Sequence, residues 1–339
     1  MTEYANLIHL PKPPSIAAWS STVGKKEGDG PLGKCFDAVE PDSRLGQQTW
    51  EQAESELQKR TIRLLLEKSG CKPQDLACLF AGDLINQCTS STFAIRGSDI
   101  PYLGLFGACS TFAEGLLLAA SMVSGMDLPR CAVLTSSHFS SAERQFRFPL
   151  SYGGQRTPNA QWTCTAAGAA LLTPTAKPPY VRGFCIGRIR DAGITDASNM
   201  GAAMAPAAAD TIARYLSATR TSPADYDAIV TGDLGIVGSR LLVQLMEQNG
   251  YDIRSVHRDC GVMMFDPARQ DTHAGGSGCG CSASIICGYF LPRLQCGEMW
   301  NVLYAATGAL LSPMICQQGE SIPGICHAVH LSHETGKER

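Results

Sequence analysis

Apolar residues along the chain recur either at helical spacing or in short unbroken runs. Between residues 50 and 65 they follow helical spacing, and Thr49 with Gln52 has the spacing of a capping box. This pattern predicts one long helix, which a glycine and a proline shortly after it would end. The next apolar run, 76–81, is short and uninterrupted, which predicts a strand buried on both faces.

The most apolar segment, residues 112–124, carries apolar side chains almost all round a helical projection. A helix of this kind lies in the interior of a protein and not on its surface. A turn of small residues, 107–111, precedes it, and a further buried strand is predicted over 131–135. The first forty residues are rich in Gly, Pro, Ser and Lys, so we expect an extended arm or surface loop there.

The second half of the chain repeats the order of elements in the first. A predicted helix over 202–216 leads to an apolar run that ends in Gly232-Asp233-Leu234, as the earlier run ends in Gly82-Asp83-Leu84. Residues 278–284 then open another helix, which a strand follows. Two copies of a strand, turn, helix, strand unit predict a pseudo-twofold α/β protein, with helices covering mostly parallel sheets.

A proline-rich stretch at 177–179 marks the seam between the two copies. A chain of 339 residues is long enough for two such compact units. We therefore expect an N-terminal half at 1–178, with an extended arm over 1–45, and a C-terminal half at 179–339.

The composition, with 44% hydrophobic and 17% charged residues, fits a well-packed globular protein. Its net charge of −3 gives no sign of a nucleic-acid surface or a polybasic membrane anchor. The 15 cysteines lack paired C-x-x-C spacings, which argues against a structural zinc site and suits a reducing interior. We find no secretory signal and no run of about 18 apolar residues, so we expect a soluble chain that reaches a membrane only through a partner.

Cys109 is the candidate nucleophile, because small neighbours let the backbone turn sharply and leave the sulfur facing a cleft. Thr111 and Glu114 have the spacing of a capping box, which would start a helix just beyond the sulfur. The free N–H groups of that helix would favour a thiolate. The alternative is that Cys109 is a small buried residue in a tight turn.

Several strings in the chain carry a family resemblance. They are ERQFRFPL at 143–150, YGGQR at 152–156, AQW at 160–162, GGSGCGCS at 275–282, and GESIPG at 319–324 with His327. A duplicated α/β chain with a cysteine before a buried helix resembles the thiolase superfamily, and these strings resemble its stage V sporulation protein AD family. The resemblance implies a thiolase-like fold, with two βαβαβαββ halves in an αβαβα arrangement, usually as a homodimer.

The same resemblance implies a role in moving dipicolinic acid into the developing spore. Such a protein would be soluble inside the developing spore and peripheral to the inner spore membrane, beside membrane proteins of the same sporulation operon. It implies no cofactor and no nucleic-acid partner, although calcium could arrive with dipicolinate. Asp83 or Asp233 could then add oxygen ligands, although an aspartate after glycine at a strand end more often fixes a turn.

A condensing enzyme of this superfamily needs two polar groups beside its cysteine, commonly His with Asn or a second His. Where ketoacyl synthases place the histidine, this chain has Asp233, which cannot donate a hydrogen bond when ionised. Where they carry Asn, residues 278–281 offer no amide. We therefore favour a non-catalytic protein that binds dipicolinate or its calcium chelate. The alternatives are an acyltransferase that uses Cys109, and a structural partner whose cleft is a relic.

Dipicolinate is a flat ring with two carboxylates, so it calls for planar, bidentate donors and a surface on which to stack. Arg144, Arg147 and Arg156 alternate with aromatic residues such as Tyr152, which makes this segment the predicted source of those donors. The arginines could instead pair with acids such as Glu143.

Three histidines complete the candidates. His138 directly follows a buried strand, where ligand sites of α/β proteins gather, and His273 and His327 could also reach a cleft. A strand around His327 and His330 would place them on opposite faces, so no metal site is predicted there. The predicted ligand-binding residues are therefore Cys109, His138, Arg144, Arg147, Tyr152, Arg156, Asp233, His273 and His327.

Overall fold

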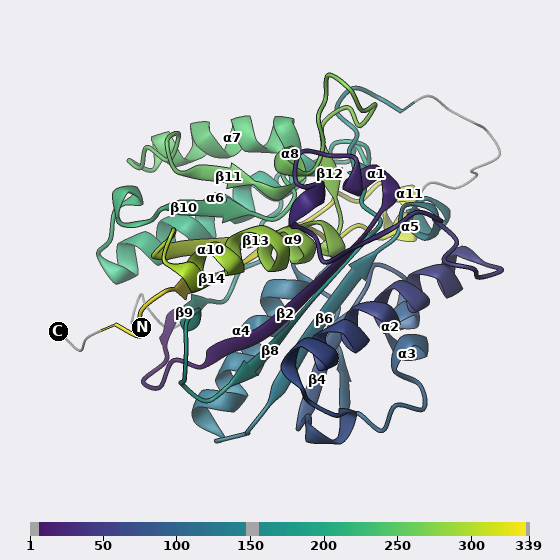
Figure 1. The fold of residues 1–339 in the computed structure, drawn as a ribbon. Helices are drawn as coiled ribbons and strands as arrows, with labels where there is room; N and C mark the ends of the chain where they lie inside the picture. Colours follow the sequence, from purple (N-terminus) through teal and green to yellow (C-terminus); the bar gives the residue numbers. More distant parts are fainter. Residues whose placement is uncertain (1–6, 147–155, 337–339) are drawn as a thin grey trace.

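The computed structural model of the chain describes residues 7–146 and 156–336, and it is a layered α/β protein (Figure 1). Most of its strands lie side by side in one long sheet. The strands are β1 (Leu7–His9), β2 (Ser15–Gly24), β3 (Ala38–Glu40), β4 (Cys78–Gly82), β5 (Tyr102–Gly104), β6 (Cys131–Ser137), β7 (Trp162–Thr163), β8 (Ala166–Thr173), β9 (Tyr180–Cys185), β10 (Ala228–Thr231), β11 (His257–Asp259), β12 (Gly276–Ser277), β13 (Asn301–Ala309) and β14 (Gly324–Ser332).

The long sheet consists of two equivalent halves. From one edge the order is β5-β4-β6-β8-β2, and from the other it is β11-β10-β13-β14-β9. The two halves meet where Ser15 of β2 pairs with Tyr180 of β9. In each half the outer pairs are parallel and the inner pairs antiparallel. The predicted pseudo-twofold repeat is therefore confirmed, but each half is a mixed sheet and not a mostly parallel one.

Helices form three layers around the two halves. On the outside, α2 (Trp50–Ser69) packs on β2, β6 and β8, while α6 (Met200–Thr219) packs on β13 and β14 (Figure 1). Between the halves lie α4 (Thr111–Gly125), which contacts strands of both, and α9 (Cys279–Ile285). This arrangement is the αβαβα layering expected of a thiolase-like fold.

The other helices are shorter or lie at the edges. They are α1 (Lys25–Gly28), α3 (Thr89–Ile95), α5 (Phe139–Phe146), α7 (Gly235–Gln248), α8 (Cys260–Met264), α10 (Leu291–Cys296) and α11 (Pro313–Gln317), with a π-helix at Ile286–Phe290 and 3₁₀ turns at Gly33–Cys35, Pro73–Asp75, Asn86–Cys88 and Pro223–Asp225. The helix predicted from residue 50 is α2, where Thr49 and Gln52 form the expected capping box. It ends at Gly70, whose φ of 68° a residue with a side chain seldom adopts.

The expectation of a surface arm at the start of the chain is wrong for β2. This strand is ten residues long, lies next to the centre of the sheet and buries Ile16, Trp19 and Val23. Its prolines and glycines stand before it and at its end, so they bound the strand instead of interrupting it. The proposed division between residues 178 and 179 falls between β8 and β9 and stays a prediction.

One described helical segment, Ala108–Gly125, is long and apolar enough to cross a membrane by length and composition alone. The sequence prediction that no such run occurs is therefore wrong. In the structure 67% of this segment is buried. It contains α4, and contacts with strands of both halves explain why α4 is apolar almost all round.

Candidate functional site

Cys109 lies in the turn between β5 and α4. Ala108, directly before it, has a φ of 49°, in the left-handed region that residues other than glycine rarely adopt. The Thr111 hydroxyl donates to the Ala108 carbonyl at 2.6 Å and accepts from the Gly107 N–H at 3.0 Å. The turn is therefore tight and strained, as the small residues around the sulfur predict.

The prediction of a thiolate at Cys109 is wrong. Burial and the neighbouring Asp233 carboxyl raise the pKa of the Cys109 thiol well above its usual value. The predicted capping box does not form either, because Thr111 is already the first residue of α4 and bonds back into the turn. Loss of water and a nearby negative charge thus outweigh the N–H groups of the helix, and the thiol stays protonated.

Asp233 follows β10 and is fully buried beside the thiol. Its Oδ2 accepts hydrogen bonds from Ser277 Oγ and the Gly278 N–H, both at 2.9 Å, and its Oδ1 accepts one from Thr307 Oγ1 at 2.9 Å. Burial raises the pKa of Asp233, while these donors and the thiol lower it. Asp233 is not among the residues that line the cavity described below, so the structure does not place it where a ligand would touch it.

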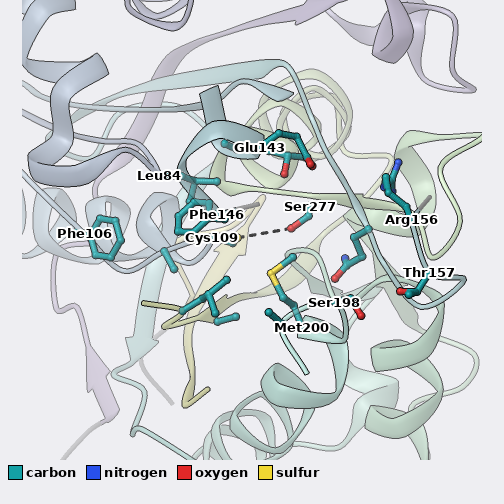
Figure 2. Close-up of a pocket in the computed structure, with 17 residues that line it drawn as sticks. Leu84, Phe106, Cys109, Glu143, Phe146, Arg156, Thr157, Ser198, Met200 and Ser277 are labelled. Atoms are coloured by element: carbon teal, nitrogen blue, oxygen red, sulfur yellow. Dashed lines mark hydrogen bonds between the residues drawn. The ribbon is translucent and has the colours of Figure 1, made fainter. Parts of the chain in front are cut away.

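Ser277 is the site residue that the sequence did not reveal. Its Oγ lies 3.9 Å from Cys109 Sγ (Figure 2). The sequence analysis considered the turn at 278–281, and nothing in this glycine-rich string marks Ser277 as a residue close to the sulfur. The Ser277 hydroxyl has one proton, and the hydrogen bond to Asp233 uses it. This position therefore supplies neither an amide nor a free donor.

Next to Cys109 is a cavity of about 290 Å³, near the lower end of the roughly 300–1,000 Å³ of small-molecule sites. One part of its wall is apolar and comprises Leu84, Phe106, Ala142, Phe146, Met200 and Leu311. The polar part includes Glu143, Arg156, Thr157, Thr163, Ser198 and Ser277. Figure 2 shows Phe106 and Arg156 at opposite ends of this space. The wall thus combines apolar surface for a ring with one cation and several hydroxyl groups.

Of the predicted arginines, Arg156 reaches this cavity together with Cys109. Arg144 does not, because its side chain is 53% exposed and its Nε lies 3.5 Å from Glu51 Oε1. That contact matches the alternative in which an arginine simply pairs with an acid. Arg147 and Tyr152 lie outside the described residues.

His138 directly follows β6, but it faces away from the cavity. Its Nε2 lies 2.8 Å from the Ser43 carbonyl, and its ring lies 5.6 Å from that of Trp50. Burial lowers the pKa of His138. It lines a different, outer cavity of about 840 Å³. The position at a strand end was predicted correctly, but the direction of the side chain was not.

The other two histidines do not line the Cys109 cavity either. His273 Nδ1 lies 2.7 Å from the Thr157 carbonyl oxygen, and His273 Nε2 lies 3.0 Å from Asp271 Oδ1. His327 accepts the Gly187 N–H at 3.1 Å, and burial lowers its pKa to about 4. It belongs to β14, so strand alternation puts it opposite His330, as predicted.

The residues considered for calcium have other partners. Asp83 accepts hydrogen bonds from the Ile85 N–H at 2.9 Å and from the Ser91 N–H and hydroxyl at 2.8 and 2.7 Å. Asp83 therefore fixes the turn after its own strand, which is the alternative noted above, whereas Asp233 accepts its hydrogen bonds from residues far along the chain. Within residues 7–146 and 156–336, no three His, Cys, Asp or Glu side chains are grouped to hold a metal ion.

A second buried carboxyl lies close to Asp83. Glu54 of α2 accepts hydrogen bonds from Ser136 at 2.8 Å and from Ser141 at 2.5 Å. Burial, and after it the charge of Asp83, raise the pKa of Glu54 to about 8. Ser141 belongs to α5, the helix that supplies Phe146 to the cavity wall, so Glu54 ties α2 to that wall.

This fold, with a cysteine turn between the two halves, defines a thiolase-like α/β protein. It is similar to 3-oxoacyl-[acyl-carrier-protein] synthase III from Aquifex aeolicus VF5, at 12% identity, TM-score 0.56 and coverage of 95% of this chain and 99% of that one. It is also similar to a Xanthomonas campestris OleA variant with cerulenin, at 13% identity, TM-score 0.60 and coverage of 97% and 98%.

The sequence comparisons go further than the fold. The stage V sporulation protein AD family model matches residues 5–332. The chain is 40% identical over 316 residues to stage V sporulation protein AD of Bacillus subtilis (strain 168), with 93% of each chain covered. The chain therefore belongs to the stage V sporulation protein AD family, as its sequence strings suggested, and this membership supports a role in sporulation.

Proposed function

We propose that this protein binds dipicolinate, alone or as its calcium chelate, without catalysis, and takes part in its uptake into the developing spore. The observation that supports the proposal is the Cys109 cavity. Its wall can hold a small molecule, but the His and Asn side chains that a condensing enzyme places beside its cysteine are replaced by Asp233 and Ser277. The carboxyl group of Asp233 lies beside a protonated thiol and accepts the one hydrogen bond that the Ser277 hydroxyl can donate. A pocket of this kind holds a ligand without activating a nucleophile.

The cavity wall suits a flat diacid. The guanidinium of Arg156 offers planar, paired N–H donors to one carboxylate. The apolar side chains of Leu84 and Phe146 give the ring a surface on which to pack, and the hydroxyl group of Thr157 adds a polar contact. Glu143 also lines the cavity, and its carboxylate would favour a ligand that arrives with its own calcium ion.

A second candidate is acyl transfer from a thioester through Cys109, because this residue lines the cavity from a strained turn. The two functions predict different outcomes. An acyltransferase would form an acyl adduct on Cys109 with an acyl-CoA and lose turnover as Cys109→Ser. A binding protein would form no adduct.

The decisive experiment is a calorimetric titration with dipicolinate, with and without calcium, against phthalate as a diacid that lacks the ring nitrogen. We expect saturable heat with dipicolinate, a weaker response to phthalate, and a loss of affinity of about tenfold or more in Arg156→Ala. Equal heats from both acids would refute a specific site. Arg144→Ala is the matched control, because Arg144 lies outside the cavity.

We also propose a homodimer that uses the β5 edge of the sheet. An edge strand has unpaired backbone groups that can pair with a second chain. Around β5, the apolar side chains of Phe93, Leu103 and Phe106 are 52%, 46% and 50% exposed. We place the dimer inside the developing spore, at the inner spore membrane, beside membrane proteins of the same operon.

A further inference from the structure

The side chains of Lys26 and Arg156 both lie close to the indole ring of Trp162. The next residue in the chain, Thr163, lines the Cys109 cavity. Lys26 Nζ lies 3.4 Å from the ring centroid, and Arg156 Cζ lies 4.9 Å from it. The ring of Phe139 stacks on the same indole, with centroids 3.8 Å apart and planes 10° from parallel. Trp162 is thus a rigid platform that holds an ammonium and a guanidinium group close together.

The two cations line different cavities, which have no described lining residue in common but are lined by neighbouring residues of the same two elements. Lys26, in α1, lines the outer cavity of about 840 Å³, and Arg156 lines the Cys109 cavity. Both α5 and β7 contribute to both spaces, because Phe139 and Trp162 face the outer one while Phe146 and Thr163 face the inner one. Because Lys26 Nζ and Arg156 Cζ lie 3.4 and 4.9 Å from the centroid of the same indole ring, a ligand bound at Trp162 would be close to both cations.

Holding these like charges together costs free energy. Burial and then the charge of Arg156 lower the pKa of Lys26, and the charges of Asp271 and Glu27 offset part of this effect. Lys26 Nζ donates to the backbone carbonyl of Asp271 at 3.2 Å, while the Asp271 carboxylate lies 3.0 Å from His273. A negative group placed between Lys26 and Arg156 would turn this repulsion into two attractions.

We propose that Lys26 and Arg156 form a two-cation clamp that selects a dicarboxylate over a monocarboxylate. Arg156 binds one carboxylate through its paired donors, and Lys26 binds the other as a point charge. The inference rests on the proposed function and adds to it the residue that recognises the second carboxylate. Lys26 lies about 130 positions from Arg156, so no local sequence pattern indicates that the two belong to one site.

The test compares dipicolinate with picolinate, which has one carboxylate. Lys26→Met keeps an unbranched side chain on Trp162 and removes the charge. We expect its affinity for dipicolinate to fall about tenfold or more, while its affinity for picolinate changes about twofold or less. Lys26→Arg restores the charge and should retain the preference for dipicolinate. The control is Lys25→Met, because Lys25 is 69% exposed and pairs with Asp29.

Calorimetry gives the affinities. Because the chain has four tryptophans, the fluorescence change on binding is compared with that of Trp162→Phe to check that the ligand reaches Trp162. If the unaltered protein binds dipicolinate and Lys26→Met and Lys25→Met bind it with equal affinity, the two-cation clamp is refuted and the proposed function stands. If the unaltered protein does not bind dipicolinate at all, both fail. Should Lys26→Met not fold, a Lys26→Arg protein that has lost its preference for dipicolinate would also refute the clamp.

Discussion

The hydroxyl group of Ser277 donates a hydrogen bond of 2.9 Å to Asp233 Oδ2, while its oxygen stays 3.9 Å from the Cys109 sulfur. The Ser277 hydroxyl therefore donates its hydrogen bond to the buried carboxyl group and not to a ligand oxygen. A ketoacyl synthase needs donors directed at the thioester, and here the donors nearest the sulfur are directed at Asp233. Ser277 and Asp233 therefore satisfy each other's hydrogen bonds next to the cavity, and the Ser277 hydroxyl has no proton left for a ligand.

Substitution of Ser277 by Ala should destabilise the fold. Asp233 Oδ2 would lose one of its donors while it remains buried, which costs about 1–3 kcal/mol of unfolding free energy. Urea denaturation at pH 7 measures the difference. Ser198→Ala is the control, because it removes a hydrogen bond to Asp196 that is exposed to solvent and should therefore cost less, about 0.5 kcal/mol. Equal stability of both variants would contradict the role assigned to Ser277.

Asp233→Asn should make the Cys109 thiol more acidic. After burial, the carboxyl of Asp233 raises the thiol pKa through its charge and its hydrogen bond, so a neutral amide removes the charge and leaves only a weaker acceptor. The rate at which iodoacetamide alkylates Cys109, followed by peptide mass spectrometry from pH 7 to 10, should rise at lower pH than in the unaltered protein. Asp271→Asn, an exposed substitution, should leave the profile unchanged. An unchanged profile in Asp233→Asn would show that burial alone protects the thiol.

Some features of the Cys109 site could be predicted from the sequence, and others could not. The turn, its helix and the repeat were predictable, because small residues and apolar spacing act over a few neighbouring positions. The protonated thiol was not, because its pKa is raised first by burial and then by Asp233, and both depend on residues that are far away in the sequence. Ser277 and Lys26 were missed for the same reason, since their roles depend on residues brought close by the fold. His138 shows that a correct strand end does not fix the direction of a side chain.

Stability should depend on pH through Glu54. Its pKa is about 8 in the folded protein and about 4.3 in an unfolded chain. The folded state therefore binds more protons, so this contribution is complete below about pH 4.3 and is lost as the pH rises through 8. In Glu54→Gln the side chain is always neutral, and the fall in unfolding free energy between pH 5 and 8 should become shallower.

The measurement is urea denaturation at pH 5, 6, 7 and 8. Glu67→Gln is the control, since Glu67 lies on the same helix but is exposed. This variant should keep the pH dependence of the unaltered protein. A Glu54→Gln protein with an equally steep fall would mean that other buried acids, such as Glu27 and Asp259 with pKa values raised to about 7, account for the whole effect.

The proposed dimer edge gives the last prediction. Leu103 of β5 is 46% exposed on the edge of the sheet, and Leu103→Lys would put a charge into an apolar contact between two β5 strands. Burying an unpaired ammonium is costly, and lysines on edge strands oppose pairing. We therefore expect the mass measured by light scattering to fall from that of a dimer to that of a monomer.

Val262→Lys is the matched control, because Val262 is 40% exposed but belongs to α8 and not to the β5 edge. It should leave the dimer intact. If both variants remain dimeric, the interface lies elsewhere on the molecule. If the unaltered protein is already a monomer at micromolar concentration, the homodimer proposal is wrong, and the exposed Phe93 and Phe106 must be explained without a second copy of the chain.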